Sequence, residues 1–351
     1  MKKAAKCLDQ RQHLNLSQYA YDTIKNDSLN FLETINISGF INRIVANSMH
    51  ESFNDLILAE KNRLDDELIT NGFKIDEQVQ KTIEKIAKAH RNNLIRGFNK
   101  YPKDVTLKIR LQNDIHEVFY PDNSKWSGLE YGISQGEYIK SLLEEYARKT
   151  IYEREAIFYK DIIDDLNRYI HLETDKRILQ ITLTNNNKYY CKPYRLSENY
   201  EANYNYLIGI STKEGKSDYK INSFRISRIK KIKALGINAG SGKITKKEEK
   251  EINQRIKDSS VPYMLTKPNH YIIKLSEEGM KTYNVIYHKR PAYKNKPEPE
   301  NGFYTLEIDA TDRQISDYFH QFGKDAIIIS PLKARKEFSK YYSEADNAYS
   351  E

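Results

Sequence analysis

Residues 192 to 233 read KPYRLSENYEANYNYLIGISTKEGKSDYKINSFRISRIKKIK, and this stretch decides how the rest of the chain is interpreted. Short apolar and aromatic runs, Tyr204 to Ile210 and Phe224 to Ile229, follow the polar turns 197–203 and 213–217. Runs of this length bounded by turn residues are typical of strands in a small β-barrel. We therefore expect residues 171–236 to form such a barrel.

Period-2 alternation gives the expected barrel a basic outer surface. Along Phe224-Arg225-Ile226 successive side chains point to opposite faces, so Arg225 faces out while its neighbours fill the barrel. The candidate nucleic-acid-binding residues of this surface are Lys192, Tyr194, Arg195, Tyr204, Tyr206, Arg225 and Arg228. Cations hold phosphates and aromatic rings stack on unpaired bases. The alternative interpretation is a solvated charged face over core tyrosines.

Two motifs in this stretch resemble the WYL domain, a family of Sm-like (SH3-type) barrels named for a Trp-Tyr-Leu triplet. They are Asn205-Tyr206-Leu207, with Asn in place of Trp, and Phe224-Arg225 followed by Arg228-Ile229. Phe322-Gly323, Ile327 to Leu332 and Arg335 resemble the extension that follows many WYL domains. The resemblance covers residues from about 155 to 349 and implies that the barrel binds nucleic acid.

Before the barrel, two segments each begin with an alternating strand and continue as helices. The strands are His13 to Ser17 and Val105 to Leu111. Each unit resembles the ribbon-helix-helix module, whose paired strands enter the DNA major groove. Since one unit alone cannot bury its core, we expect the two to pair within the chain, with Leu14 and Leu16 facing Leu107 and Ile109. Helices over 53–69 and 77–98 would form an inserted arm.

The outer face of that ribbon is a second candidate site for nucleic acid. His13 and Asn15 on the first strand, and Thr106, Lys108 and Arg110 on the second, would point outward. Arg and Lys bond guanine O6 and N7, so the second strand is suited to reading base edges. The first strand has few long basic residues. A scaffold or dimer-forming role for the module is the alternative, and the sequence leaves both open.

The fold class expected is a multidomain α+β protein. Its parts are a ribbon-helix-helix-like domain (1–150), a linker helix (151–170), the WYL barrel (171–236), a linker helix and loop (237–268) and a C-terminal α+β extension (269–351). Strands and helices alternate in the last part, which is typical of a ferredoxin-like unit. Its apolar Phe319, Phe322 and Phe338 suggest that the extension forms a homodimer.

Composition favours a polyanionic partner. The chain has 351 residues with 57 Lys and Arg against 49 Asp and Glu, a formal net charge of +8. Its 27 Tyr are possible stacking platforms, although AT-rich coding also enriches Tyr, Lys, Asn and Ile. Cys7 and Cys191 form no CxxC pair, which predicts a reduced, cytoplasmic setting without a zinc site. No cofactor, metal or membrane span is expected.

No catalytic set is evident, so we expect a protein that is not an enzyme. The spacings Arg43 to His50 and Arg110 to His116 fall within the Arg-x(4–6)-His motif of HEPN ribonucleases. That motif usually has a polar residue after the Arg, whereas Ile and Leu follow here. Gly240 to Lys243 resembles a phosphate-binding loop only superficially, because Ile follows where Ser or Thr would hold magnesium.

Two functions remain. Leu16 to Ile24 and Ser38 to Ile44 resemble the WYL accessory proteins of type VI-D CRISPR systems. That resemblance implies an accessory protein that binds single-stranded RNA and stimulates an RNA-guided RNA-cleaving effector. The alternative is a transcription regulator, in which the ribbon holds operator DNA and the barrel senses a nucleic acid or nucleotide.

Overall fold

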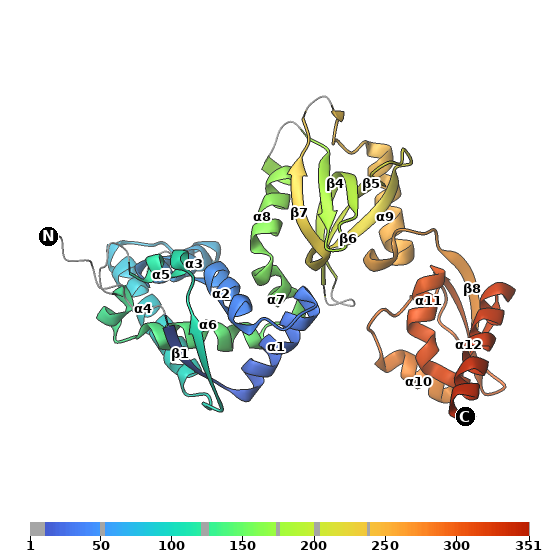
Figure 1. Cartoon of the computed structure of the whole chain (residues 1–351), viewed down its shortest axis with the longest axis horizontal. Helices are drawn as coiled ribbons and strands as arrows, with labels where there is room; N and C mark the ends of the chain where they lie inside the picture. The colour runs from blue at the N-terminus through green and yellow to red at the C-terminus, as the bar shows by residue number, and fades with distance from the viewer. Residues whose placement is uncertain are drawn as a thin grey trace. The chain divides into compact units, whose positions relative to one another are not determined.

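The computed structural model describes residues 11–49, 53–120, 126–172, 176–199, 204–236 and 239–350. The chain divides into two compact units, Met1–Lys160 and Asp161–Glu351 (Figure 1). The first is mainly helical and the second contains two antiparallel sheets, so the α+β class is confirmed. Within the described residues, no helix is both long and apolar enough to cross a membrane.

The N-terminal unit is built on a two-stranded antiparallel ribbon. Its elements are β1 (Arg11–Leu16), α1 (Gln18–Leu32), α2 (Ile37–Ser48), α3 (Phe53–Thr70), α4 (Glu77–Asn99), β2 (Val105–Arg110), α5 (Asn113–Phe119), η2 (Ser127–Tyr131), α6 (Gln135–Arg148) and α7 (Ile151–Phe158). β1 pairs with β2, and Leu14 lies opposite Leu107. Leu14, Leu16 and Ile109 are buried. The expected pairing of the two strands within one chain is therefore confirmed.

Buried polar and aromatic contacts fasten the helices to the ribbon. The Asn42 amide on α2 donates to the Arg110 carbonyl, and its oxygen accepts from the Gln112 backbone N–H, which ties the end of β2 to α2. Phe40 of α2 stacks on Phe158 of α7 with ring centroids 4.3 Å apart. Both strand-helix units thus share one core, which neither could bury alone.

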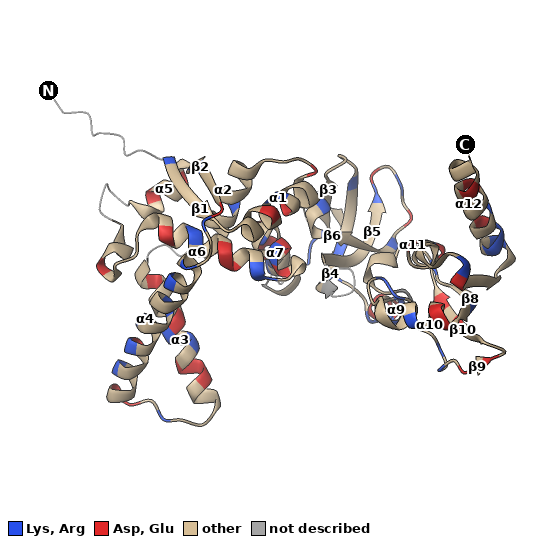
Figure 2. Cartoon of the chain, turned by 90° about the horizontal axis from the view of Figure 1, so that it is seen from below, with Lys and Arg blue, Asp and Glu red and all other residues tan. Residues whose placement is uncertain are grey.

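The inserted arm is a helical hairpin formed by α3 and α4, as expected, and it projects from the rest of its unit (Figure 2). Gly72, with φ of +83°, lies in the turn directly after α3, and this left-handed conformation is one that glycine adopts without strain. Asp76 then caps α4 by accepting from the Val79 N–H over 2.8 Å.

The linker that we expected as one helix is interrupted. α7 ends at Phe158, α8 runs over Lys160–Asn167, and the π-helical turn η3 (Arg168–Leu172) follows. Tyr159 at the break has φ of −106° and ψ of 29°. Its buried hydroxyl donates to the Phe31 carbonyl, so this residue is anchored in the N-terminal core, and the two units divide directly after Lys160.

The WYL-like segment forms an open, curled sheet. Its elements are β3 (Leu179–Leu183), β4 (Lys188–Asn199), β5 (Tyr204–Lys213), β6 (Lys220–Arg225), η4 (Ile226–Arg228), β7 (Ile229–Ala234) and α9 (Lys246–Ser259). The strand order is β6-β5-β4-β3-β7. β6 and β7 are opposite edges joined by one 3-10 turn, so the sheet must curl until they meet there. The turn redirects the chain to pair with β3, and no β6–β7 ladder closes the expected barrel among the described strands.

The C-terminal elements are η6 (Val261–Tyr263), β8 (Asn269–Ser276), α10 (Glu277–Val285), β9 (Pro299–Glu300), β10 (Phe303–Ala310), α11 (Asp312–Phe319), η7 (His320–Asp325), β11 (Ala326–Ser330) and α12 (Leu332–Ser350). Their sheet, in the order β11-β8-β10-β9, is antiparallel throughout. A ferredoxin-like βαβ unit contains a parallel pair, so that arrangement is not confirmed. Phe319, Phe322 and Phe338 are buried in the core beneath the helices and present no apolar edge to a second subunit.

Candidate nucleic-acid interface

Four of the expected RNA-binding residues share one face of the β4-β5-β6 sheet. Arg195 lies opposite Ile208, and Tyr206 lies opposite Arg225. Side chains directly across a ladder point to the same face, and residues two apart along a strand do as well. Arg195, Tyr204, Tyr206 and Arg225 are therefore neighbours on the face that α9 and η6 partly cover.

Tyr206 lies in the core beneath that cover. Its side chain is 8% exposed and packs with Ile208, Ile252, Val261 and Met264, which come from β5, α9 and the η6 segment. A ring in this position cannot stack on a base without unpacking the helix. The expectation that Tyr206 is a stacking platform is therefore wrong for this conformation.

Lys192 and Tyr194 are engaged by acidic residues of α9. The Lys192 ammonium lies 3.2 Å from Glu248 Oε1, and the Tyr194 hydroxyl donates to Glu249 Oε1 over 3.0 Å. Burial opposes ionisation of Glu248, but hydrogen bonds from Thr245 and Lys192 outweigh it and lower the pKa of this carboxyl. A phosphate reaching Lys192 must compete with this carboxylate.

Three arginines supply the positive charge of the face and of the turn beside it. The Arg225 guanidinium carbon lies 3.1 Å from the centroid of the half-buried Tyr204 ring, a cation–π contact. Arg195 Nε is buried and has no hydrogen-bond partner among the described residues. Arg228 is exposed on η4. Arg225 Nε and Nη2 are buried, so Arg228 is the arginine of this group that is exposed to a phosphate.

The ribbon presents a second cationic face. Arg11 lies opposite Arg110 and His13 lies opposite Lys108, and all four are exposed. The next pair, Asn15 and Thr106, is joined by a 2.8 Å hydrogen bond. The outward directions expected for His13, Thr106, Lys108 and Arg110 are confirmed. Arg11 was missed because the strand was expected to begin at His13, although the alternation continues two residues further back.

Like charges directly across a ladder destabilise it. Arg11 and Arg110 are such a pair, and an anion bound beside them would offset their like charges. Lysine and arginine at this spacing suit phosphate oxygens and guanine edges equally. The geometry of the ribbon therefore fits either kind of contact and selects no particular base.

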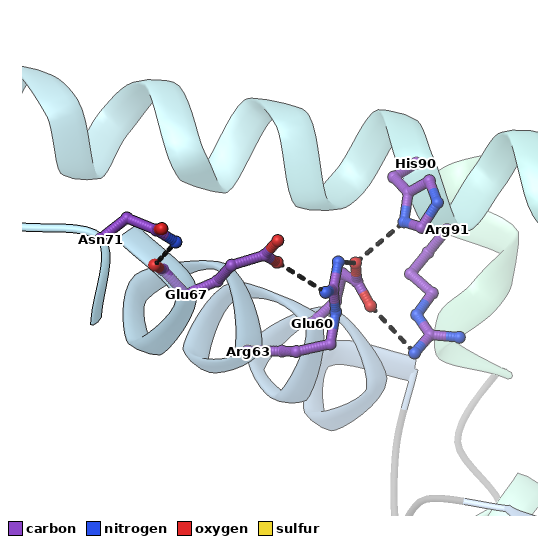
Figure 3. Close-up of polar contacts among 6 residues, drawn as sticks. All are labelled: Glu60, Arg63, Glu67, Asn71, His90 and Arg91. Atoms are coloured by element: carbon purple, nitrogen blue, oxygen red, sulfur yellow. Dashed lines mark hydrogen bonds and ion pairs between the residues drawn. The ribbon is translucent and has the colours of Figure 1, made fainter. Parts of the chain in front are cut away.

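The hairpin contains a buried charge cluster that sequence reasoning missed (Figure 3). Glu60 is 1% exposed, and its two oxygens lie 2.8–2.9 Å from Arg63 Nη2, His90 Nδ1 and Arg91 Nη2. Burial raises the carboxyl pKa, but the contacts with these three side chains outweigh burial and hold the pKa of Glu60 below its usual value. These contacts join α3 to α4 and so help to hold the two helices of the arm together.

Of the two Arg-to-His spacings, only Arg110 and His116 both lie within the described residues, and they are on different elements. Arg43 Nε donates to the Phe158 carbonyl over 2.7 Å and lies over the Phe158 ring, which is a structural role. His50 lies outside the described residues. Arg110 ends the exposed strand β2, whereas His116 is on α5, where its ring packs against Tyr120.

The possible metal ligands and the cysteines were compared with the described part of the chain. That part contains no group of three or more His, Cys, Asp or Glu side chains arranged to hold a metal. Cys191 is fully buried on β4, and burial raises the pKa of its thiol far above the usual range. The other cysteine, Cys7, lies outside the described residues.

Comparison with known proteins shows similarity of fold. No protein-family model matches the chain, and none of the curated proteins matches it by sequence. The solved structure "Crystal structure of a CRISPR Cas-related protein" is 20% identical, with a TM-score of 0.75 over 100% of this chain and 96% of that chain. Proteasome accessory factor B/C (PafBC) of Arthrobacter aurescens is 14% identical over 72% of this chain and 40% of that one, with a TM-score of 0.27 that carries no argument. The first similarity shows a common fold along the whole chain.

Proposed function

We propose that the protein is a non-catalytic accessory component of a CRISPR system, which binds single-stranded RNA and modulates an RNA-guided RNA-cleaving effector. The observation that carries this proposal is the grouping of Arg195, Arg225 and Tyr204 on one sheet face, with Arg228 exposed at the adjoining turn. The fold shared along the whole chain with a CRISPR Cas-related protein supports the biological setting.

The composition of the face favours single strands over duplexes. The half-buried Tyr204 ring can stack on an unpaired base where it is exposed, and arginines beside it bind the flanking phosphates. Duplex RNA hides its base faces and offers mainly phosphates and 2′-hydroxyls. Sequence preference should be weak, because stacking and phosphate contacts read no base edge.

The finer fold assignment is part of the same proposal. A WYL-type, Sm-like barrel is supported by the edges of the five-stranded sheet meeting at η4, which follows directly after Arg225. A ribbon-helix-helix origin of the N-terminal unit is supported by its paired strands, each followed by helices. We also propose a homodimer through the C-terminal sheet, where the exposed Ile327 and Ile329 of edge strand β11 are better candidates for the contact than the buried phenylalanines.

A second candidate function is operator binding by a transcription regulator. The exposed basic residues of the ribbon, Arg11, Lys108 and Arg110, favour it, because a two-stranded β-ribbon fits the DNA major groove. The two functions differ in which nucleic acid binds and at which face.

A side-by-side titration of labelled single-stranded RNA, single-stranded DNA and duplex DNA at one salt concentration tests the proposal. We expect single-stranded RNA to bind most tightly, and Arg195→Ala and Arg225→Ala to weaken it. Lys231→Ala, which removes an exposed cation from β7, is the matched control. Preferential binding of duplex DNA with wild-type affinity in both arginine variants would favour the regulator instead.

We also propose that the protein does not itself cleave RNA. A ribonuclease assay with the purified protein should leave RNA intact. Cleavage that disappears in both His50→Ala and His116→Ala would overturn this part of the proposal.

A further inference from the structure

A groove of about 550 Å³ lies between strands β5 and β6 and helix α9. Ile210 and Ile221, both nearly buried, form its apolar floor, and α9 forms one wall. Tyr219 and Leu265 stand at its rim with 44% and 59% of their surfaces exposed. The volume is that of a small-molecule site, and exposed aromatic and aliphatic side chains beside an apolar floor are typical of one.

The groove holds charges that the protein itself does not neutralise. Lys247 and Lys267 line it, and neither side chain has a hydrogen bond or ion pair with any described residue. The same is true of Glu251 on the α9 wall. By contrast, the neighbouring Glu248 is held by Lys192 and by the Thr245 N–H. Lys247, Lys267 and Glu251 therefore remain available to a ligand.

The rim is held in place by Arg255, which also lines the groove. Arg255 Nη1 donates to the Thr266 carbonyl over 2.8 Å and to the Met264 carbonyl over 3.5 Å, which fixes the segment that carries Leu265 and Lys267. On the other side, the Lys192 ammonium lies 5.8 Å from the Tyr219 ring centroid. The groove is thus preformed, and it adjoins a residue already assigned to the candidate RNA-binding face.

We infer that this groove binds a nucleoside 5′-phosphate unit, with the phosphate at Lys247 and Lys267 and the base against Tyr219. The unit is either a free nucleotide or one nucleotide of an RNA strand, and the second form rests on the proposed RNA binding. A single ligand that combines an anion, a flat ring and hydrogen-bond donors satisfies every available group in the groove.

Glu251 predicts which base is preferred. An ionised carboxylate only accepts hydrogen bonds. Guanine presents two adjacent donors, N1–H and the N2 amino group, on its Watson–Crick edge, whereas uracil presents one N–H between two carbonyl oxygens. We therefore expect guanosine monophosphate to bind more tightly than uridine monophosphate.

Calorimetric titration of the full chain with guanosine monophosphate, uridine monophosphate and inorganic phosphate tests the inference. Glu251→Gln should weaken guanosine monophosphate binding about tenfold, which corresponds to about 1.4 kcal/mol, because a hydrogen bond to a charged acceptor is replaced by one to a neutral acceptor. It should change uridine monophosphate binding little. Lys247→Ala with Lys267→Ala should weaken both nucleotides. Tyr219→Ala should weaken both, while Tyr219→Phe keeps the ring and the affinity. Lys250→Ala, an exposed cation of α9 outside the groove, should bind like wild type.

The inference is overturned if guanosine monophosphate binds no more tightly than inorganic phosphate, or if the Glu251 and lysine variants bind it like wild type. Short RNAs with and without one guanine distinguish a free nucleotide from a nucleotide within an RNA strand. Binding of these RNAs should depend on Tyr219 and Glu251 only if the groove holds a nucleotide of the strand. If the protein binds RNA through Arg225 but binds no nucleotide, the inference about the groove is rejected and the proposed function stands. Nucleotide binding without RNA binding removes the proposed function and leaves the groove as a free-nucleotide site.

Discussion

The guanidinium of Arg225 lies over the ring of Tyr204, with 3.1 Å between the guanidinium carbon and the ring centroid. The two residues are on neighbouring strands of one sheet face, where Arg225 is directly opposite Tyr206. The pairing has two consequences for RNA binding. It places a permanent charge beside the half-buried Tyr204 ring, and it leaves the guanidinium partly buried, with Nε and Nη2 inaccessible to solvent.

Arg225→Ala should therefore weaken single-stranded RNA binding and make it less dependent on salt. For each phosphate that the variant no longer binds, the slope of log K against log salt should become shallower by about 0.7 on a single strand. Tyr204→Ala should lower affinity by on the order of 1–3 kcal/mol per stacked base while leaving the slope nearly unchanged. Fluorescence anisotropy at several salt concentrations measures both. An unchanged slope in Arg225→Ala would mean that the RNA phosphates lie elsewhere.

Tyr206→Ala should act on folding rather than on stacking. Its ring is packed against α9 and η6, and truncating a buried aromatic side chain costs about 3–5 kcal/mol. We expect a large fall in Tm and a matching shift in chemical denaturation. Tyr206→Phe removes only the hydroxyl and is the control. A Tyr206→Ala variant that melts like wild type but loses RNA affinity would return this residue to the binding surface.

The difference between Tyr204 and Tyr206 shows what the sequence predicts and what it cannot. Alternation correctly indicates that the two rings share a face, and the runs around them correctly indicate neighbouring strands. The covering of Tyr206 depends on Ile252 and Met264, more than 40 positions along the chain, and no local pattern reveals such a contact. The acidic contacts of α9 with Lys192 and Tyr194 were hidden for the same reason.

The ribbon was easier to predict than the barrel. Each strand alternates over several residues, and only pairing between them hides both Leu14 and Ile109. Barrel closure, by contrast, depends on whether two edge strands meet in register at η4, which residue types do not determine. The buried Glu60 cluster joins residues 30 positions apart, and charged residues in helices are ordinarily expected to face solvent.

The ion pair between Asp27 and Arg154 should support the N-terminal core. Arg154 Nε lies 2.6 Å from Asp27 Oδ2, and the buried Tyr146 hydroxyl donates to the same oxygen. Asp27→Ala leaves Arg154 and Tyr146 without their partner, and removing one member of a buried pair costs about 3–5 kcal/mol. Urea denaturation measures the destabilisation. Asp22→Ala, an exposed acid on the same helix, should cost far less.

Glu60 should make the α3–α4 hairpin sensitive to acid. Its folded pKa is held below the usual value of 4.5 by Arg63, His90 and Arg91 despite burial. A carboxyl with a depressed folded pKa contributes stability that is present above its unfolded pKa and is lost as pH falls through the folded value. The protection factors of hairpin amides, which correct for the slower intrinsic exchange in acid, should therefore fall below about pH 4. At pH 7 the hairpin amides of Glu60→Gln should be less protected than those of wild type, and this difference should shrink in acid. An equal difference in protection at both pH values would contradict a stabilising role for ionised Glu60.

The basic residues of the ribbon allow a final prediction that separates the two candidate functions. Arg11 lies directly opposite Arg110, and like charges in this position are destabilising, so replacing Arg11 should not destabilise the free protein. Arg11→Gln with Lys108→Gln should therefore leave Tm unchanged or raise it slightly. If the ribbon holds operator DNA, the same variant should bind duplex DNA more weakly and show a salt slope shallower by about 0.9 for each phosphate that it no longer binds. If the ribbon is a scaffold, duplex binding should be weak from the start, and single-stranded RNA binding through Arg225 should remain at the wild-type level. Both titrations should be run on the double ribbon variant and on Arg225→Ala. If each nucleic acid binds at one face, the ribbon variant should weaken only duplex DNA binding and Arg225→Ala should weaken only single-stranded RNA binding.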